Sequence, residues 1–112
     1  MKREQRLRSP ADFRRVREVA RRGWPHPLLV VYVAPNELNR TRVGITVSGR
    51  VGNAVTRNRV RRRLREGLRA RFERLPQGAD VLVLARPPSA GAAWSELCAA
   101  LDQVLARARV RV

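Results

Sequence analysis

Residues Gly52–Glu66 read GNAVTRNRVRRRLRE, a run in which apolar residues recur among arginines. At about 100° per residue, four apolar side chains in and after this run form one slowly drifting stripe: Val60, Leu64, Leu68 and Phe72. The opposite side is polar and cationic: Asn58, Arg62, Arg65 and Arg69. This pattern predicts a helix that begins between Asn53 and Thr56, runs to Arg74, buries its stripe against a sheet and presents arginines to solvent.

Like charges crowd this predicted helix, because spacings of three and four residues place arginines beside one another. Each such pair costs about 0.2–0.5 kcal/mol in an isolated helix, and only Glu66 and Glu73 offset the repulsion. The amino-terminal end of the helix, near Arg57 and Asn58, adds a partial positive charge that suits phosphate. We therefore interpret the arginine side as a nucleic-acid contact rather than as an ordinary solvated face.

The whole chain shares this positive charge. It has 112 residues, of which 44% are hydrophobic, and its 25 basic and 9 acidic residues give a formal net charge of +16. These values predict one domain with a modest core and a polyanionic partner. Lys2 is the only lysine, so the cations are almost all guanidinium groups, which bind phosphate bidentately and stack on bases.

An anionic membrane is the alternative polyanion. The basic helix has no aromatic residue before Phe72, whereas a helix that lies on a membrane usually has a bulky aromatic face, so we expect no membrane partner. The longest apolar run, Leu28–Ala34, is too short to span a bilayer. The start of the chain lacks the apolar stretch of a signal peptide, and Cys98 is alone. These features predict a cytoplasmic protein.

The other elements follow from periodicity and from helix and turn signals. Ser9 and Pro10 predict the start of a first helix that runs to Gly23. Three strands and a short extended piece are expected at Leu28–Ala34, Arg42–Ser48, Ala79–Ala85 and Trp24–Pro27. A last helix is predicted over Ala92–Arg107, with Trp94 and Cys98 on its core side. The order predicts a single layered domain over residues 1–112.

A catalytic site within the protein is not predicted. Hydrolysis of a phosphodiester by a protein usually needs clustered carboxylates for metal ions, or histidines for proton transfer. The nine acidic residues, Asp80 among them, are scattered along the chain, and His26 is the only histidine. We therefore expect no catalytic residue and no bound cofactor or metal ion in this chain.

The sequence resembles the bacterial ribonuclease P protein family, whose hallmark is the Arg57-Asn58-Arg59 tripeptide within Gly52–Glu66. Further segments resemble the family in the same order along the chain: Leu7-Arg8, Asp12–Val16, Leu29–Tyr32, Arg42–Ser48 and Ala79–Pro87. Three departures stand out. Arg17 replaces a frequent second aromatic, Ser48-Gly49-Arg50 replaces a more cationic tripeptide, and about one residue is added near Trp24.

The resemblance implies an α+β sandwich of order α-β-β-β-α-β-α, ribosomal protein S5 domain 2-like, with a left-handed β-α-β crossover around the basic helix. It also implies the function. A large RNA subunit, which requires Mg²⁺, removes the 5′ leader from precursor tRNA by endonucleolytic cleavage. The protein, one copy per RNA subunit, binds that RNA and holds the leader. The chemistry would then lie in the RNA and not in this chain.

The resemblance assigns contacts with the RNA subunit to six residues, to which helical periodicity adds Arg69: Arg57, Asn58, Arg59, Arg61, Arg62 and Arg65. It assigns a leader-binding cleft, between the first helix and the sheet, to Phe13, Val16 and Tyr32, and Arg17 joins them because a guanidinium can also stack on bases. Core packing remains the alternative role for Phe13 and Tyr32. A basic RNA-binding scaffold protein of ribosomal-protein type remains the alternative function.

Overall fold

The computed structural model describes residues 1–111, so Val112, the last residue of the predicted single domain, lies outside the described residues. The helices and strands are α1 Pro10–Ala20, β1 Trp24–Pro25, β2 Leu29–Pro35, β3 Arg42–Val47, α2 Ala54–Ala70, β4 Ala79–Ala85 and α3 Trp94–Arg111. Three short 3₁₀ turns accompany them: η1 Arg3–Gln5, η2 Phe72–Arg74 and η3 Pro87–Gly91. This order confirms the predicted α-β-β-β-α-β-α arrangement.

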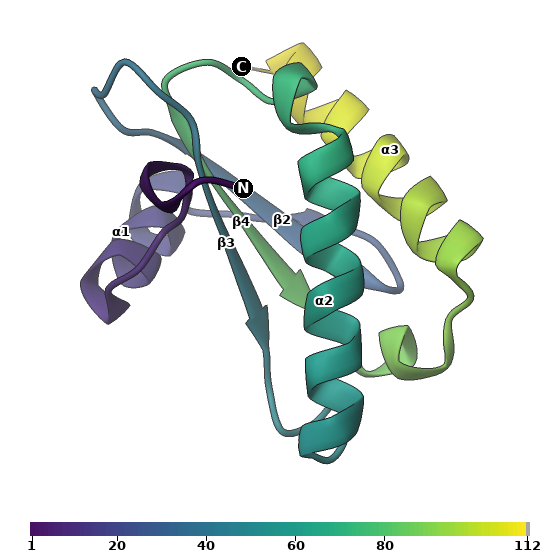
Figure 1. The fold of residues 1–112 in the computed structure, drawn as a ribbon. Helices are drawn as coiled ribbons and strands as arrows, with labels where there is room; N and C mark the ends of the chain where they lie inside the picture. The colour runs from purple at the N-terminus through teal and green to yellow at the C-terminus, as the bar shows by residue number, and fades with distance from the viewer. Residues whose placement is uncertain (112) are drawn as a thin grey trace.

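The strands form one mixed sheet in the order β1-β2-β4-β3. β2 is antiparallel to both β1 and β4, whereas β3 and β4 are parallel and are joined through α2. In Figure 1 both parallel strands run downward, α2 lies in front of them, and β4 lies to the right of β3. This connection is left-handed, as the family resemblance implied and against the general rule for parallel strands.

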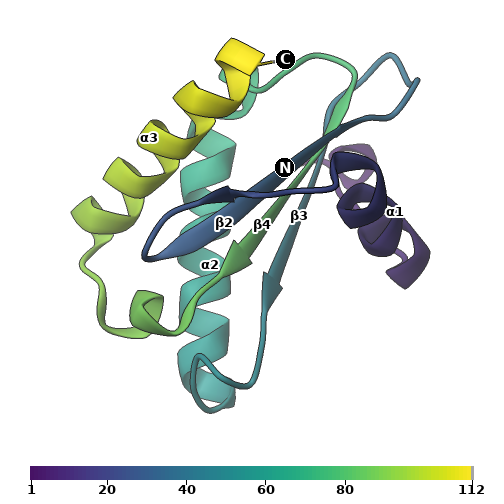
Figure 2. The same ribbon diagram turned by 180° about the vertical axis from the view of Figure 1, so that it is seen from behind.

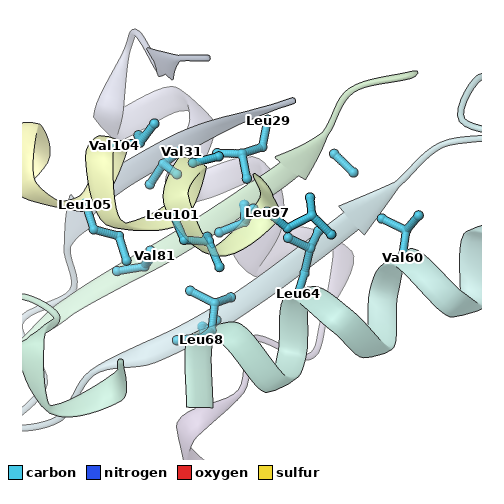
Figure 3. Close-up of a cluster of buried hydrophobic side chains, with 14 of the residues drawn as sticks. Leu29, Val31, Val60, Leu64, Leu68, Val81, Leu97, Leu101, Val104 and Leu105 are labelled. Carbon is cyan, nitrogen blue, oxygen red and sulfur yellow. The ribbon is translucent and has the colours of Figure 1, made fainter. Parts of the chain in front are cut away.

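The helices cover the sheet unequally, with α1 on one face and both α2 and α3 on the other (Figures 1 and 2). The larger core lies between the sheet and the helix pair, where α2 contributes Val60, Leu64 and Leu68 (Figure 3). All three side chains are at most 1% exposed, so the apolar stripe is confirmed. Burial of such a stripe is the main stabilising contribution of an amphipathic helix.

Side-chain caps set the beginnings of α1 and α2. The Ser9 hydroxyl oxygen accepts a hydrogen bond from the Asp12 amide at 3.1 Å, and the Asn53 side-chain oxygen accepts one from the Thr56 amide at 2.9 Å. Both bonds satisfy an amide that the first helical turn leaves free. The two predicted helix starts are therefore confirmed.

Both helices end earlier than predicted. α1 stops at Ala20 rather than Gly23, because Arg21 takes a φ of 64°, outside the helical region. α2 stops at Ala70 rather than Arg74, because the backbone tightens into the 3₁₀ turn η2 after Arg71. Val60, Leu64 and Leu68 of the predicted stripe stay in α2, whereas Phe72 lies in η2 and is only partly buried.

α3 begins at Trp94 rather than Ala92 and ends at Arg111 rather than Arg107, and the predicted core position of Trp94 is wrong. Trp94 is 44% exposed rather than buried in the core, because it is the first residue of α3 and lies at the margin of the helix pair. Cys98 is only partly buried. The residues that pack α3 onto the sheet are Leu97, Leu101, Val104 and Leu105.

On the opposite face, α1 packs through a second and smaller cluster of buried residues, Leu7, Val16, Ala34 and Leu82, flanked by the partly buried Phe13 and Tyr32. Gly44 of β3 permits this close approach. A Cβ atom on Gly44 would stand 2.7 Å from Phe13 Cε1 and 2.8 Å from Leu7 Cδ1. These distances are shorter than ordinary van der Waals contact, so any side chain at this position would force the Phe13 ring and the Leu7 side chain to shift.

Gly44→Ala is expected to destabilise the protein by about 1–3 kcal/mol through overpacking. Gly49→Ala is the matched control, because a Cβ on Gly49 would meet no heavy atom within 4 Å. Urea unfolding followed by circular dichroism would measure both. Equal midpoints for the two variants would contradict the close packing of α1 on β3.

Candidate nucleic-acid interface

The helix α2 carries seven arginines and one glutamate between Ala54 and Ala70. Among the described residues, only Arg69 of these seven lies within 4.0 Å of a carboxylate, with Nη2 2.7 Å from Oε2 of Glu66. Six guanidinium groups on one helix therefore have no acidic partner in the part of the chain that the structure describes. Such a concentration of uncompensated charge favours a polyanion.

Arg69 differs from its neighbours through this ion pair. The hydrogen bond from Arg69 and its charge hold the pKa of the Glu66 carboxyl below its usual value, and the same bond raises the pKa of Arg69. Both side chains are more than half exposed, so solvent screens the pair. Of the predicted contacts, Arg69 is the one whose charge is already partly neutralised.

The outer side of α2 bears a shallow depression that brings together three residues of the predicted face, Asn58, Arg62 and Arg65, but not Arg69. Its lining consists of Val55, Asn58, Arg61, Arg62 and Arg65. Arg61 donates a hydrogen bond to the Asn58 side-chain oxygen at 2.8 Å, which orients both side chains. Val55 is 74% exposed at the rim. The depression therefore offers hydrogen-bond donors and positive charge on a surface that is open to solvent.

The remaining arginines of the predicted set have different surroundings. Arg59 donates to the backbone oxygen of Ala90 at 3.2 Å, and Arg63 donates to that of Ala92 at 3.1 Å, so these two side chains tie α2 to η3 and to the start of α3. Arg57 is half-buried, and its Nε atom has no hydrogen-bond partner. The family resemblance assigned Arg59 to the RNA contacts, and nothing in the sequence indicated that Arg59 and Arg63 brace the neighbouring segment.

The second predicted group lies on the other face of the sheet, around α1. The Arg17 guanidinium carbon is 5.5 Å from the centroid of the Tyr32 ring, a cation–π arrangement. Phe13 and Tyr32 are both partly buried beside it. Val16 is fully buried, so its side chain contributes packing rather than accessible surface. The structure therefore brings Phe13, Arg17 and Tyr32 together at a partly exposed site.

The strand residues beside Tyr32 extend this site. Val30, Leu84 and Thr46 are register neighbours on β2, β4 and β3, and they share the α1 face with Tyr32. All three are only partly buried, whereas Leu82 on the same face is buried. Hence α1 covers one end of this face and leaves the other end partly accessible.

A buried carboxylate holds α1 against the sheet. Asp80 is completely buried and accepts two hydrogen bonds from Arg42, at 2.9 and 2.8 Å, and one from Asn36 at 2.9 Å. Arg15 of α1 lies 3.5 Å away. The hydrogen bond to Asp80 raises the pKa of Arg42. Sequence reasoning counted Asp80 among scattered acids, although a lone charge in the apolar run Ala79–Ala85 was a usable signal.

The described residues hold no group of three or more His, Cys, Asp or Glu side chains arranged for a metal ion. None of their helices is both long enough and apolar enough to cross a membrane.

The left-handed α+β fold and the largely unpaired arginines of α2 define an RNA-binding class of protein. Residues 1–109 match the family model described as Ribonuclease P. The chain belongs to this family, so it is a subunit of an endoribonuclease that works as a ribonucleoprotein in tRNA processing. This result confirms the predicted family and main function, and it favours them over a ribosomal-type scaffold.

Individual relatives agree. The chain is 46% identical over 110 residues to the ribonuclease P protein component of Herpetosiphon aurantiacus, covering 98% of this chain and 89% of the relative. It is 41% identical over 111 residues to that of Roseiflexus sp. (strain RS-1), covering 98% and 90%. The Staphylococcus aureus RNase P protein structure superposes with a TM-score of 0.86 at 32% identity, covering 95% and 96%. The Thermotoga maritima protein gives 0.81 at 26%, covering 91% and 96%.

Proposed function

We propose that the outer side of α2 binds the RNA subunit of ribonuclease P, with one protein per RNA. The depression lined by Asn58, Arg61, Arg62 and Arg65 supports this assignment, because none of its arginines has a carboxylate partner among the described residues. Phosphate groups of the RNA would provide the negative charge that these arginines lack in the protein, and their oxygens would accept hydrogen bonds from the guanidinium N–H groups. Arg59 would act mainly by bracing η3, and Arg69 would contribute least because of Glu66.

The opposite face would hold the 5′ leader of precursor tRNA. Phe13, Arg17 and Tyr32 offer two aromatic rings and a guanidinium plane at a partly exposed site, and such groups stack on unpaired bases. The departure at Arg17 is then functional, because the guanidinium over Tyr32 replaces a second ring. Val16 would support this surface from beneath.

The chemistry in this proposal belongs to the RNA subunit, which requires Mg²⁺, and the holoenzyme works in the cytoplasm. The protein's own residues bind and orient the two RNAs and hold no catalytic group. Four of the nine acidic residues, Asp12, Glu66, Asp80 and Asp102, are engaged by arginines, which supports this division. No metal or other cofactor is assigned to the protein.

Reconstitution tests the function as a whole. The protein would be added to a cognate ribonuclease P RNA and precursor tRNA at low Mg²⁺, and release of the leader would be timed. Faster release of the leader is the expected outcome. An unchanged rate with correctly folded RNA would sink the proposal.

Tyr32→Ala tests the leader site separately. In the holoenzyme it is expected to weaken binding of leader-bearing precursor tRNA by roughly fivefold or more, from the loss of one stacked base, and to leave binding of leaderless tRNA unchanged. Phe72→Ala is the matched control, because Phe72 is a partly buried aromatic that packs against the other cluster. Equal losses for the two tRNAs would place the leader elsewhere.

A further inference from the structure

Trp94 is exposed where the sequence predicts a core residue. Four large hydrophobic side chains are exposed among the described residues, and Trp94, at 44%, is the aromatic one. Trp94 opens α3, directly after the segment that Arg59 and Arg63 of α2 hold by hydrogen bonds to Ala90 and Ala92. The backbone that carries the indole is therefore held beside α2.

Gly67 of α2 supports the ring from one side. The indole Cη2 atom lies 3.9 Å from the point where a Cβ on Gly67 would stand, and Leu101 Cδ1 lies 2.6 Å from that point. Gly67 is itself buried. The missing side chain at Gly67 makes room for Leu101, and the edge of the indole lies beside the same point of α2, while 44% of Trp94 stays exposed.

Arginines and acidic residues both lie near Trp94, and Arg63 is the nearby arginine that has no carboxylate partner among the described residues. Arg63 and Arg71 lie one turn before and one turn after Gly67 on the same helix, and Arg71 donates to the Gly67 backbone oxygen at 3.0 Å. The nearby acids are engaged. Glu66 pairs with Arg69, Asp102 pairs with Arg71 and Arg74, and Glu96 accepts from the Ala93 amide at 2.7 Å. An exposed aromatic ring beside an arginine-rich helix offers a surface on which a nucleic-acid base can stack.

We propose that an unpaired base of the RNA bound on α2 stacks on the Trp94 indole. The inference rests on the proposed RNA-binding face of α2 and extends it towards α3. Five residues separate Arg62 from Gly67, which is about 7.5 Å along the helix axis. Arg62 and Gly67 are also about 140° apart around the helix, so one RNA segment would pass over the edge of α2 that carries Arg63 to place a phosphate at Arg62 and a base on Trp94. Stacking of this kind tolerates any base, because each has a π face.

Three substitutions separate stacking from packing. Trp94→Leu keeps an apolar side chain over Gly67 but removes the aromatic face, Trp94→Phe keeps an aromatic face, and Trp94→Ala removes both. Affinity for the cognate RNA subunit would be measured by filter binding over a range of salt concentrations. Trp94→Leu and Trp94→Ala are expected to bind roughly 5- to 100-fold more weakly, and Trp94→Phe within about threefold of the unsubstituted protein. The salt dependence should not change, because stacking releases no counterions.

The outcomes distinguish failure of the stacking site on Trp94 from failure of the RNA-binding surface on α2. If Trp94→Leu binds as well as the unsubstituted protein, or if Trp94→Phe binds as weakly as Trp94→Ala, the stacking site is wrong. An Arg62→Ala, Arg65→Ala double variant is measured in parallel. If it binds weakly while all three Trp94 variants bind normally, the α2 surface stands and only the stacking inference falls. If it also binds normally, the α2 surface itself is wrong, and the inference falls with it.

Discussion

Asp80→Ala is expected to destabilise the protein by about 3 kcal/mol or more, the usual cost of removing one partner from a buried ion pair. The Asp80 carboxylate has no exposed surface, and Arg42, its bidentate partner, is 16% exposed. Without Asp80, the Arg42 and Asn36 donors would remain in the interior with fewer acceptors. Because Arg15 also faces this carboxylate, we expect the packing of α1 on the sheet to weaken as well.

Asp102→Ala is the matched control for Asp80→Ala. The Asp102 carboxylate also contacts two arginines, Arg71 and Arg74, but it is 47% exposed, and an exposed pair contributes about 1 kcal/mol or less. Thermal and urea unfolding would measure both variants. The melting temperature should fall by roughly 10 °C or more for Asp80→Ala and by much less for Asp102→Ala. Similar losses would show that burial does not decide the strength of these contacts.

Arg62→Ala combined with Arg65→Ala is expected to weaken binding to the RNA subunit by at least about tenfold, because a hydrogen bond to a charged group contributes about 1.5–3 kcal/mol. Each phosphate contact adds about 0.7–0.9 to the slope of log affinity against log salt. The double variant should therefore reduce the slope by roughly 1.5. Filter binding between low and physiological salt would measure both quantities.

The control for this double variant is Arg3→Ala combined with Arg22→Ala. Both control arginines are exposed and lie outside α2, and either double variant lowers the formal net charge from +16 by two. A general loss of charge would affect the two variants equally, whereas a defined contact surface affects only the α2 variant. An equal change of slope in both would move the RNA contacts away from the α2 depression.

The spacing of residues along the chain correctly predicted the features that depend on neighbouring residues. The stripe Val60, Leu64 and Leu68, the Ser9 cap and the strand Ala79–Ala85 could be located because their determinants lie within a few residues of one another. The left-handed crossover could not be derived in this way. Handedness depends on how α2 returns over the sheet, and only the family resemblance supplied it.

The missed features depend on contacts that are distant in sequence. Asp80 meets partners 38 and 44 residues away, so its role was invisible in the strand alone. The spacing of Trp94 from Leu97, Cys98 and Leu101 places it on the apolar side of α3. Spacing does not reveal where α3 begins relative to α2, and this position decides whether Trp94 is buried. The bracing by Arg59 spans 31 residues. In each of these cases the sequence shows the residue itself, but not the distant residue that it contacts in the fold.

The four-stranded sheet gives the two proposed sites a fixed geometry. α2 lies on one face and α1 on the other, and layers of secondary structure pack about 10 Å apart. If both proposed sites are correct, the RNA subunit would bind on the α2 side of the sheet and the leader on the α1 side. The protein would then act as a spacer, setting how far apart two RNA strands are held regardless of their sequences. The central strand β4, which is buried except for the half-buried Leu84, would be the part that keeps that distance constant.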